Sequence, residues 1–176
     1  ISFFKLFDFI FFHIMILDGK DITGLSTRKV LQAGINFVPE DRHYHGIFKI
    51  RSICSNTTSA LLDSKEIGAV NMNRRRQSEI AQKYVKDFRT KIVSLEDQIG
   101  SLSGGNQQKV CIARALAMNP RLLFVSEPTR GIDIGAKKLV LETLVRLNRE
   151  KGMTVVMVSS ELMELRSICD RIAIVA

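Results

Sequence analysis

Two clusters of polar and glycine residues in this 176-residue chain have the types and spacing that anion chemistry requires. The first is Ser103-Gly104-Gly105-Asn106, which stands directly before a stretch with helical apolar spacing. Glycines leave backbone N–H groups open, and a helix amino terminus carries unpaired N–H groups at the positive end of its dipole. The residues therefore favour a phosphate-type anion site, although a helix capped by Ser103 after a glycine turn explains the same pattern.

The second cluster follows two apolar runs. Residues 122–125 are followed by Ser126 and Glu127, and residues 154–158 are followed by Ser159, Ser160 and Glu161. Parallel sheets bind ligands at the carboxyl ends of their strands, so these polar residues are candidates for a site. A carboxylate there can accept a proton or orient a water molecule. Taken singly, Glu127 and the nearby Asp133 also fit turn or helix-cap chemistry.

The strands and helices that position these clusters are predicted by an alternation of apolar runs and amphipathic stretches. This alternation predicts an α/β fold with a largely parallel sheet, and strands so apolar predict helices on both faces. We expect a polar loop over residues 40–46. The expected strands are 34–39, 122–125, 154–158 and 171–175, and the expected helices are 55–89, 136–151 and 161–167.

The long helical stretch is predicted to start at a cap formed by Asn56 or Thr57 and to bury one face containing Ile80, Tyr84, Val85 and Phe88. It contains the basic run 74–76. A phosphate or membrane-surface contact is one interpretation of that run, and a solvated helix start or loop is the favoured one.

Composition fits one soluble globular domain, with 45% hydrophobic and 25% charged residues. The net charge of +8 permits an anionic partner and selects none. The cysteines Cys54, Cys111 and Cys169 are widely spaced, which predicts reduced thiols. His43 and His45 lack nearby carboxylate or cysteine partners, so we predict no metal site.

Residues 1–17 are rich in Phe and Ile but carry Lys5, Asp8 and His13. They are shorter than the roughly 20 apolar residues that span a bilayer, and they lack the pattern of a signal peptide. We hypothesise that residues 1–14 are an apolar leader translated from non-coding or frameshifted DNA.

Taken in order, the motifs resemble those of the ATP-binding-cassette (ABC) nucleotide-binding domain: a signature motif, a Walker B strand with its adjoining glutamate, a D-loop and a switch segment. The sequence segments 38–42 and 127–133 are similar to those in the second cassette of tandem ATPases that import ribose, galactose and xylose into bacteria. The resemblance covers residues 16–176. It implies a P-loop NTPase-like α/β fold with a helical subdomain, and ATP and Mg²⁺ as cofactors.

The resemblance also implies a role for each matched residue. Glu127 would be the catalytic glutamate that orients or deprotonates the attacking water, and Asp133 would be the D-loop aspartate that contacts across a dimer. Four residues match the signature and would donate hydrogen bonds to the γ-phosphate of ATP held by a partner cassette: Ser103, Gly104, Gly105 and Asn106.

The first departure from the family pattern concerns the Walker A loop. No Gly-x₄-Gly-Lys-Ser/Thr motif occurs in the chain: Gly19-Lys20 is followed by Asp21, and Ile14 stands where the first glycine belongs. That loop supplies the backbone cradle and the lysine for the phosphates. We therefore expect the amino-terminal strand and Walker A loop to be missing, and ATP binding by the chain alone to be weak.

Three further positions depart from the general pattern. Ser126 occupies the Walker B aspartate position and removes a charge that steadies Mg²⁺, so we identify no metal ligand. Glu40 stands at the Q-loop glutamine position and Ser160 at the switch histidine position. The residues at these last two positions are similar to those found there in the second cassette of sugar importers.

The resemblance divides the chain into the leader, 1–14, and a partial nucleotide-binding domain, 15–176. Residues from about 41 to 117 would form the helical subdomain, and those from about 118 to 176 would form the Walker B, D-loop and switch core. The implied partners are a second cassette, transmembrane permease subunits and, indirectly, a sugar-binding protein, with no nucleic acid. The implied location is peripheral, on the cytoplasmic face of the plasma membrane.

Three functions remain open at this point. The leading one is a partial second cassette of a sugar-importer ATPase. The alternative is a non-catalytic cassette remnant that dimerises or occupies transporter subunits, which the absent phosphate loop and Ser126 favour. A DNA-repair or chromosome-type ATPase shares the signature and Walker B strand, but its motifs are separated by long coiled coils, and no sustained heptad run occurs here.

Overall fold

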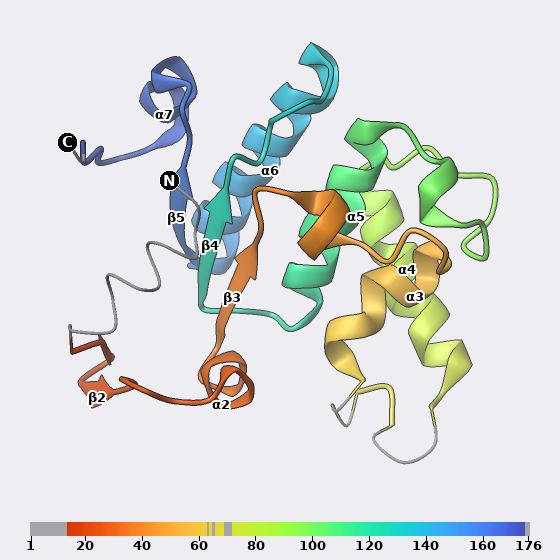
Figure 1. The fold of residues 1–176 in the computed structure, drawn as a ribbon, viewed down its shortest axis with the longest axis horizontal. Helices are drawn as coiled ribbons and strands as arrows, with labels where there is room; N and C mark the ends of the chain where they lie inside the picture. The colour runs from red at the N-terminus through yellow and green to blue at the C-terminus, as the bar shows by residue number, and fades with distance from the viewer. Residues whose placement is uncertain (1–13, 63, 65, 69–71, 175–176) are drawn as a thin grey trace.

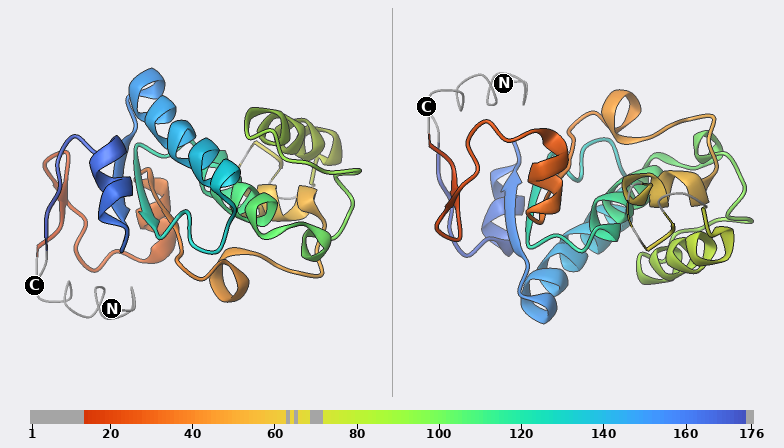
Figure 2. Two further views of the ribbon diagram at one scale, coloured as in Figure 1. Left: turned by 90° about the horizontal axis from the view of Figure 1, so that it is seen from above. Right: turned by 90° about the horizontal axis from the view of Figure 1, so that it is seen from below.

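The computed structural model describes residues 14–62, 64, 66–68 and 72–174. Apart from Ile14, the hypothesised leader lies outside the described residues. The described part is elongated: its strands lie toward one end, and helices α3 (Ile53–Thr58) and α4 (Arg74–Asp87) lie toward the other (Figures 1 and 2). The chain therefore separates a sheet-containing region from a helical one.

The central sheet has three parallel strands in the order β3 (Ile35–Val38), β4 (Leu122–Ser126) and β5 (Thr154–Val158). Val38 pairs with Val125, which pairs with Met157, so the three strands end at a common edge. This arrangement confirms the predicted α/β fold with a parallel sheet. It also brings the segments that follow each strand to the same side of the molecule.

Helices α5 (Gly104–Ala117) and α6 (Ile134–Lys151) cover one face of this sheet. Leu123 and Leu144 are at most 1% exposed in the core that these elements share. Asp133 caps the start of α6, and Gly152 ends it in the left-handed conformation at φ 62°, which glycine adopts without a steric penalty. The expected helix 136–151 is thus confirmed, starting two residues earlier.

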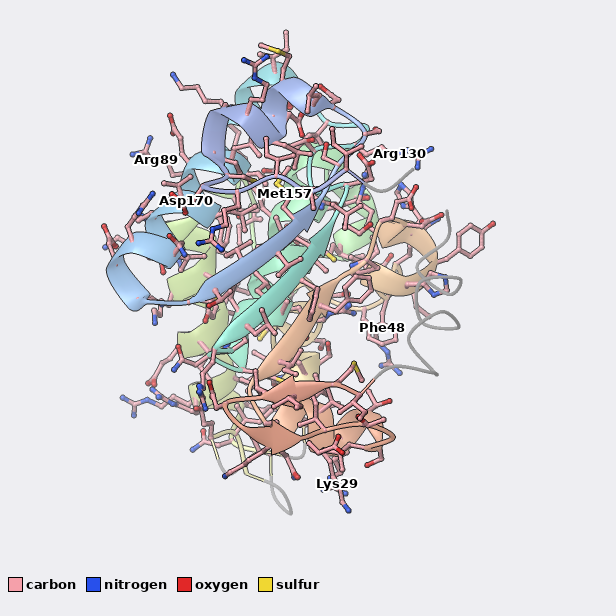
Figure 3. The ribbon with its side chains drawn as sticks, turned by 90° about the vertical axis from the view of Figure 1, so that its left-hand side faces the viewer. Lys29, Phe48, Arg89, Arg130, Met157 and Asp170 are labelled. Carbon is pink, nitrogen blue, oxygen red and sulfur yellow. The ribbon has the colours of Figure 1, made fainter. Side chains whose placement is uncertain are left out.

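The opposite sheet face is less covered than the apolar strands predict. Val156 and Val158 on β5 remain 40% and 46% exposed. Figure 3 looks onto this face, and no described helix crosses it. The prediction that β5 is covered on both faces is therefore wrong for the described residues. Among the described residues β5 is also the edge strand of the sheet, but the exposure of Val156 and Val158 comes from the absence of a covering element on their face.

The expected helix over residues 55–89 is two helices rather than one. Ser52, not Asn56 or Thr57, caps α3, and its hydroxyl accepts a hydrogen bond from the Ser55 N–H; the turn η2 (Ser59–Leu61) follows. Asn73 then caps α4. Such N-caps start a helix where a side chain satisfies its first free N–H groups, and composition alone does not locate that start.

Two interpretations of the α4 region are confirmed. Arg74, Arg75 and Arg76 form an exposed helix start, and two of them pair with Glu79. The predicted apolar face is buried and packs into the core: Ile80, Tyr84, Val85 and Phe88.

Two further expectations are corrected. The segment expected as a loop over 40–46 contains a helical turn, η1 (Arg42–Gly46), because the Asp41 carboxylate accepts hydrogen bonds from the His43 and Tyr44 N–H groups. Residues 171–174 form no strand, because among the described residues β5 pairs only with β4. The predicted short helix is present as α7 (Leu162–Ile168).

Smaller elements complete the description: β1 (Ile16–Leu17), β2 (Lys20–Asp21), α2 (Thr27–Gln32) and η3 (Ile99–Ser101). All three cysteines have free thiols, as predicted. Within the described ranges no group of three or more His, Cys, Asp or Glu side chains is arranged to hold a metal ion. No described helix is long and apolar enough to cross a bilayer.

Candidate functional site

The carboxyl edge of the sheet joins Glu127 to Ser160. The Glu127 N–H donates to the Val158 carbonyl over 2.8 Å, and its carboxylate Oε1 accepts from the Ser160 N–H over 2.6 Å. Glu127 adopts φ 44°, a left-handed conformation that is uncommon for residues with a Cβ. Backbone and side chain together therefore fix the candidate catalytic glutamate against the segment that follows β5.

The start of α5 presents unpaired N–H groups. Ser103 occupies the N-cap position but makes no capping hydrogen bond, and its exposed hydroxyl accepts only from the Asn106 side-chain amide, over 3.2 Å. Among the described residues, no acceptor faces the N–H groups of Gly104, Gly105 or Asn106. A helix start with open donors and an exposed hydroxyl can bind an anion, as the sequence predicts.

Both signature glycines lie where a larger residue would meet neighbouring groups. A Cβ added at Gly105 would come within 2.9 Å of the Ala136 Cβ, because α5 starts directly against α6. A Cβ at Gly104 would lie 2.9 Å from Arg42 Nη2 and 3.2 Å from the Gly131 carbonyl oxygen. The glycines thus allow the helix start to approach the turn after β4.

Arg42 and Glu40 connect the segment after β3 to that same turn. Arg42 donates from Nη1 to the Arg130 carbonyl over 2.9 Å and from Nη2 to the Gly131 carbonyl over 3.4 Å. Glu40 forms an ion pair with the Arg130 guanidinium. The residue at the Q-loop position is therefore already engaged with the D-loop segment of its own chain.

Asp133 acts as the N-cap of α6, since its Oδ1 accepts from the Ala136 N–H over 2.9 Å. This hydrogen bond from the Ala136 N–H is the main reason that the pKa of Asp133 lies below its ordinary value. Ser126 ends β4 and is only 5% exposed, so the Walker B position carries a buried hydroxyl group instead of a carboxylate. Ser126 thus lies at the carboxyl end of β4, where the apolar run places it, and Asp133 lies at the start of the following helix.

The Gly19-Lys20 pair forms a hairpin and not a phosphate loop. Asp18 and Gly19 have φ 48° and 75°, and they connect the antiparallel strands β1 and β2. Positive φ at both central residues is the mark of a type I′ turn. Lys20 lies in β2 and the next helix, α2, begins only at Thr27, so the described residues place no helix start directly behind this turn to cradle a phosphate.

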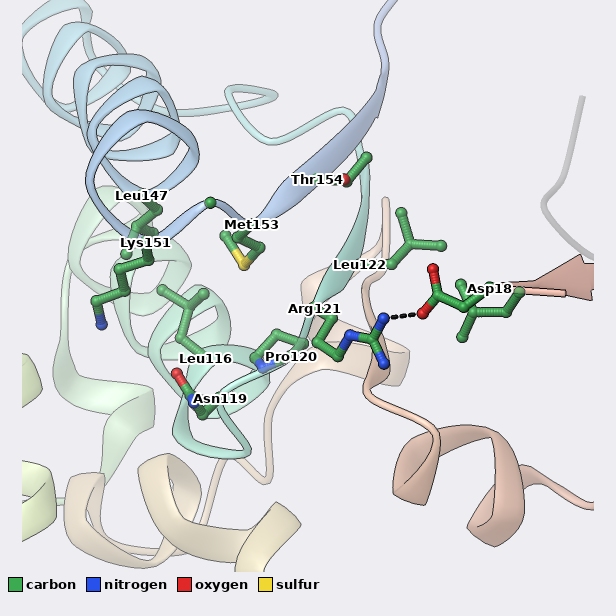
Figure 4. A pocket seen from close by; sticks show the side chains of 12 residues that line it. Asp18, Leu116, Asn119, Pro120, Arg121, Leu122, Leu147, Lys151, Met153 and Thr154 are labelled. Carbon is green, nitrogen blue, oxygen red and sulfur yellow. Dashed lines mark ion pairs between the residues drawn. The ribbon is translucent and has the colours of Figure 1, made fainter. Parts of the chain in front are cut away.

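A hollow of about 330 Å³ lies at the opposite, amino-terminal ends of β4 and β5 (Figure 4). Leu116, Leu147 and Met153 line it, and the ion pair between Asp18 and Arg121 borders it. Leu122 and Thr154, the first residues of their strands, also line it, which places it away from Glu127 and Ser160. The hollow is therefore separate from the candidate site.

The structure brings most of the predicted residues together around one turn, residues 128–131. Glu127, just before this turn, accepts from the Ser160 N–H, and the glycines at the start of α5 approach Gly131 and Asp133 at the end of the turn. Within the described residues no hydrogen bond or ion pair joins Ser103 or Asn106 to Glu127. The start of α5 and the Glu127 carboxylate are therefore not directly linked.

Sequence reasoning missed three residues that hold this arrangement: Arg42, Thr129 and Glu164. Arg42 lies within the sequence segment 38–42, but its hydrogen-bond acceptors are backbone carbonyls far away in the chain. Glu164 lies three residues after Glu161, and only packing shows which of the two is buried.

Comparison with known proteins agrees with this geometry. The family model described as ABC transporter matches residues 13–130, more than half of the chain. The chain belongs to the ABC transporter family. Two curated proteins similar to this ABC chain are the galactose/methyl galactoside import ATP-binding protein MglA of Treponema pallidum and the xylose import ATP-binding protein XylG of Moorella thermoacetica. The first is 42% identical over 91% of the chain and the second 41% identical over 90%.

The ABC chain spans about a third of these relatives, 32% of the first and 31% of the second. A solved structure of the ATP-binding cassette MJ0796, a dimer bound to ADP and Pi, matches 85% of the chain and 63% of its own length. The TM-score is 0.68 at 25% sequence identity. The α/β cassette fold and the similarity to sugar-import ATP-binding proteins are thus confirmed.

Proposed function

We propose that this chain is a partial second cassette of an ABC importer for simple sugars, coupling ATP binding and hydrolysis to transmembrane carbohydrate transport. About 40% identity to relatives named as galactose, xylose and ribose import ATP-binding proteins supports the substrate class. The observation that carries the proposal is the open start of α5, where three N–H groups have no acceptor among the described residues and the Ser103 hydroxyl is exposed.

ATP held by a second cassette would place its γ-phosphate against this helix start. The donors there are fixed by α5 itself, so binding needs no reorganisation, and hydrogen bonds to an ionised phosphate are about twice as strong as neutral ones. When bound, ATP supplies the phosphoryl group to be transferred. Ser103 would donate its hydroxyl proton to a phosphate oxygen, and Gly104, Gly105 and Asn106 would donate their N–H groups.

Glu127 would serve the chain's own nucleotide site by orienting a water molecule through its free Oε2, while Oε1 stays on the Ser160 N–H. Mg²⁺ fits the described residues less well than phosphate does. Ser126 gives the Walker B position no charge, so Glu127 is the carboxylate remaining there. A full site of this kind requires a Walker A loop from elsewhere.

The proposed helical subdomain, from about residue 41 to 117, carries exposed apolar side chains beside η1. Tyr44, Phe48 and Ile50 are 83%, 54% and 78% exposed. Apolar side chains exposed this far commonly mark contact surfaces. We propose that this surface docks transmembrane permease subunits, which places the chain peripherally on the cytoplasmic face of the membrane and links it indirectly to a sugar-binding protein.

A chimera tests the proposal. The matched segment of the Treponema pallidum relative is replaced by residues 15–176, and ATP hydrolysis and sugar uptake are measured in its transporter. We expect both activities to persist. Gly104→Val keeps its N–H but places a branched side chain at the helix start, so the phosphate could not approach the donors, and we expect hydrolysis to fall by about 100-fold, as when one transition-state contact is lost. Gly152→Asn, at the left-handed cap of α6, is the matched control and should leave both activities unchanged. Equal activity of Gly104→Val and the control would refute the proposal.

The second candidate is a cassette remnant that binds transporter subunits or a second cassette without hydrolysing ATP. Ser126 favours it, because this buried hydroxyl group cannot replace the aspartate. Calorimetric titration of the chain with Mg-ATP separates the two. Binding at micromolar nucleotide contradicts the remnant, and no binding at millimolar nucleotide, together with an inactive chimera, supports it.

A further inference from the structure

Glu164 is a buried carboxylate that the proposed function does not use. It is 5% exposed on α7, although Asp and Glu are almost never fully buried without partners. Here it has three: the Lys137 ammonium at 2.7 Å, the Thr129 hydroxyl at 2.8 and 2.7 Å from its two oxygens, and the Ser159 hydroxyl at 3.3 Å. The Lys137 ammonium thus balances the negative charge of Glu164, and the two hydroxyl groups donate hydrogen bonds to its oxygens.

These partners come from three different elements. Lys137 belongs to the first turn of α6, Thr129 to the turn after β4, and Ser159 to the segment after β5. Thr129 stands two residues after Glu127, and Ser159 immediately precedes Ser160. The two segments that Glu164 joins are therefore the same two that meet in the hydrogen bond from the Ser160 N–H to Glu127.

The carboxylate is ionised in this arrangement. Burial is the largest single influence and would raise the pKa of Glu164, but the hydrogen bonds from Lys137, Thr129 and Ser159 and the positive charge of Lys137 together bring that pKa below its ordinary value. A buried carboxylate accepts at two oxygens, so it can bind two loops simultaneously. Thr129 is itself 2% exposed and has no alternative acceptor among its hydrogen bonds in the described residues.

We propose that Glu164 is a positioning residue for Glu127: by binding Thr129 and Ser159 together, it holds the turn after β4 and the segment after β5 at the separation where the Ser160 N–H reaches the Glu127 carboxylate. The inference rests on the proposed role of Glu127 in nucleotide hydrolysis. Its physical content, a link between Glu164 and the Glu127–Ser160 hydrogen bond, is independent of any nucleotide.

Amide hydrogen exchange measured by NMR on the 176-residue chain tests this link. Glu164→Gln keeps the shape of the side chain but loses its charge and one acceptor oxygen. We expect the Ser160 amide to exchange at least about tenfold faster, with the core amide of Leu144 unchanged. Equal acceleration at both amides means general destabilisation and overturns the proposal, as does an unchanged Ser160 amide.

Glu161→Gln is the matched control. Glu161 is the exposed second partner of Lys137, also at 2.7 Å, and it does not touch Thr129. We expect this variant to leave Ser160 exchange within about twofold of the parent. A Ser160 effect as large as that of Glu164→Gln would assign the role to the Lys137 charge and overturn the proposal.

Two further variants keep the test decisive if Glu164→Gln fails to fold. Thr129→Val removes one donor with little change in volume, and it should accelerate Ser160 exchange by a smaller factor than Glu164→Gln. In a Glu127→Ala background the Ser160 N–H has already lost its acceptor, so adding Thr129→Val should change nothing more. An additive effect there would overturn the proposal, whereas failure of nucleotide binding would affect only the proposed function.

Discussion

The Glu127 carboxylate lies 2.6 Å from the Ser160 backbone nitrogen, so the residue that we propose as the catalytic glutamate is bound to the residue that we propose at the switch position. The donor is the backbone N–H of Ser160, so this hydrogen bond does not depend on the side chain at position 160. The hydrogen bond couples the two strand ends on which the proposed chemistry depends.

The backbone of Glu127 predicts an unusual order of stabilities. Its φ of 44° costs a residue with a Cβ about 1–2 kcal/mol, and glycine avoids that cost. We expect Glu127→Gly to be more stable than Glu127→Ala by about 1 kcal/mol in urea unfolding. The same pair of substitutions at Lys138, inside α6, should show the reverse order by about 1 kcal/mol. The same order at both positions would contradict the strain argument.

The two signature glycines should respond differently to alanine. At Gly105 the added methyl meets the Ala136 Cβ at 2.9 Å, between two packed helices, and we expect a loss of about 1–3 kcal/mol in unfolding free energy. At Gly104 the nearest atom is the flexible end of Arg42 and the Gly131 carbonyl oxygen lies 3.2 Å away, a milder contact than that between the two helices, so we expect a smaller loss than at Gly105. Denaturant midpoints of both variants measure the difference. Equal losses would show that α5 and α6 separate more easily than the contact indicates.

Glu164 predicts a pH dependence of stability. Its folded pKa lies below the ordinary value of 4.5, so the ionised form stabilises the fold above that pH, and the contribution is lost as the pH falls through the folded pKa. Urea unfolding at pH 7 should show Glu164→Gln less stable than the parent, and the gap should shrink progressively below pH 4.5. A gap that is constant between pH 7 and acid pH would show that the carboxylate charge is irrelevant.

Arg42 should stabilise the turn that carries the D-loop segment. Arg42→Lys cannot reach both the Arg130 and Gly131 carbonyls with one ammonium, and we expect a loss of about 1.5 kcal/mol in unfolding free energy. Exchange of the amides in residues 128–131 should accelerate as well. Arg75→Lys is the control: Arg75 is 91% exposed and pairs only with Glu79, so a change below about 0.5 kcal/mol is expected.

Several features of the fold follow from local chemistry alone. Apolar runs locate β3, β4 and β5, and the left-handed cap at Gly152 ends α6 where the glycine in the sequence predicts. The glycine-rich start of α5 is present with its N–H groups open. These features depend on neighbours in sequence, which is why they could be predicted.

Packing decided the rest. Val156 and Val158 on β5 stay exposed because no described helix packs on that face of the sheet, which the apolar run in the sequence does not reveal. The sequence by itself determined the motifs, their order and the family they resemble. Only the tertiary structure decided that Glu164, rather than Glu161, is the buried carboxylate. Glu164 joins Thr129 to Ser159, and it lies 35 positions from Thr129 in the chain, so no local pattern in the sequence could predict the contact.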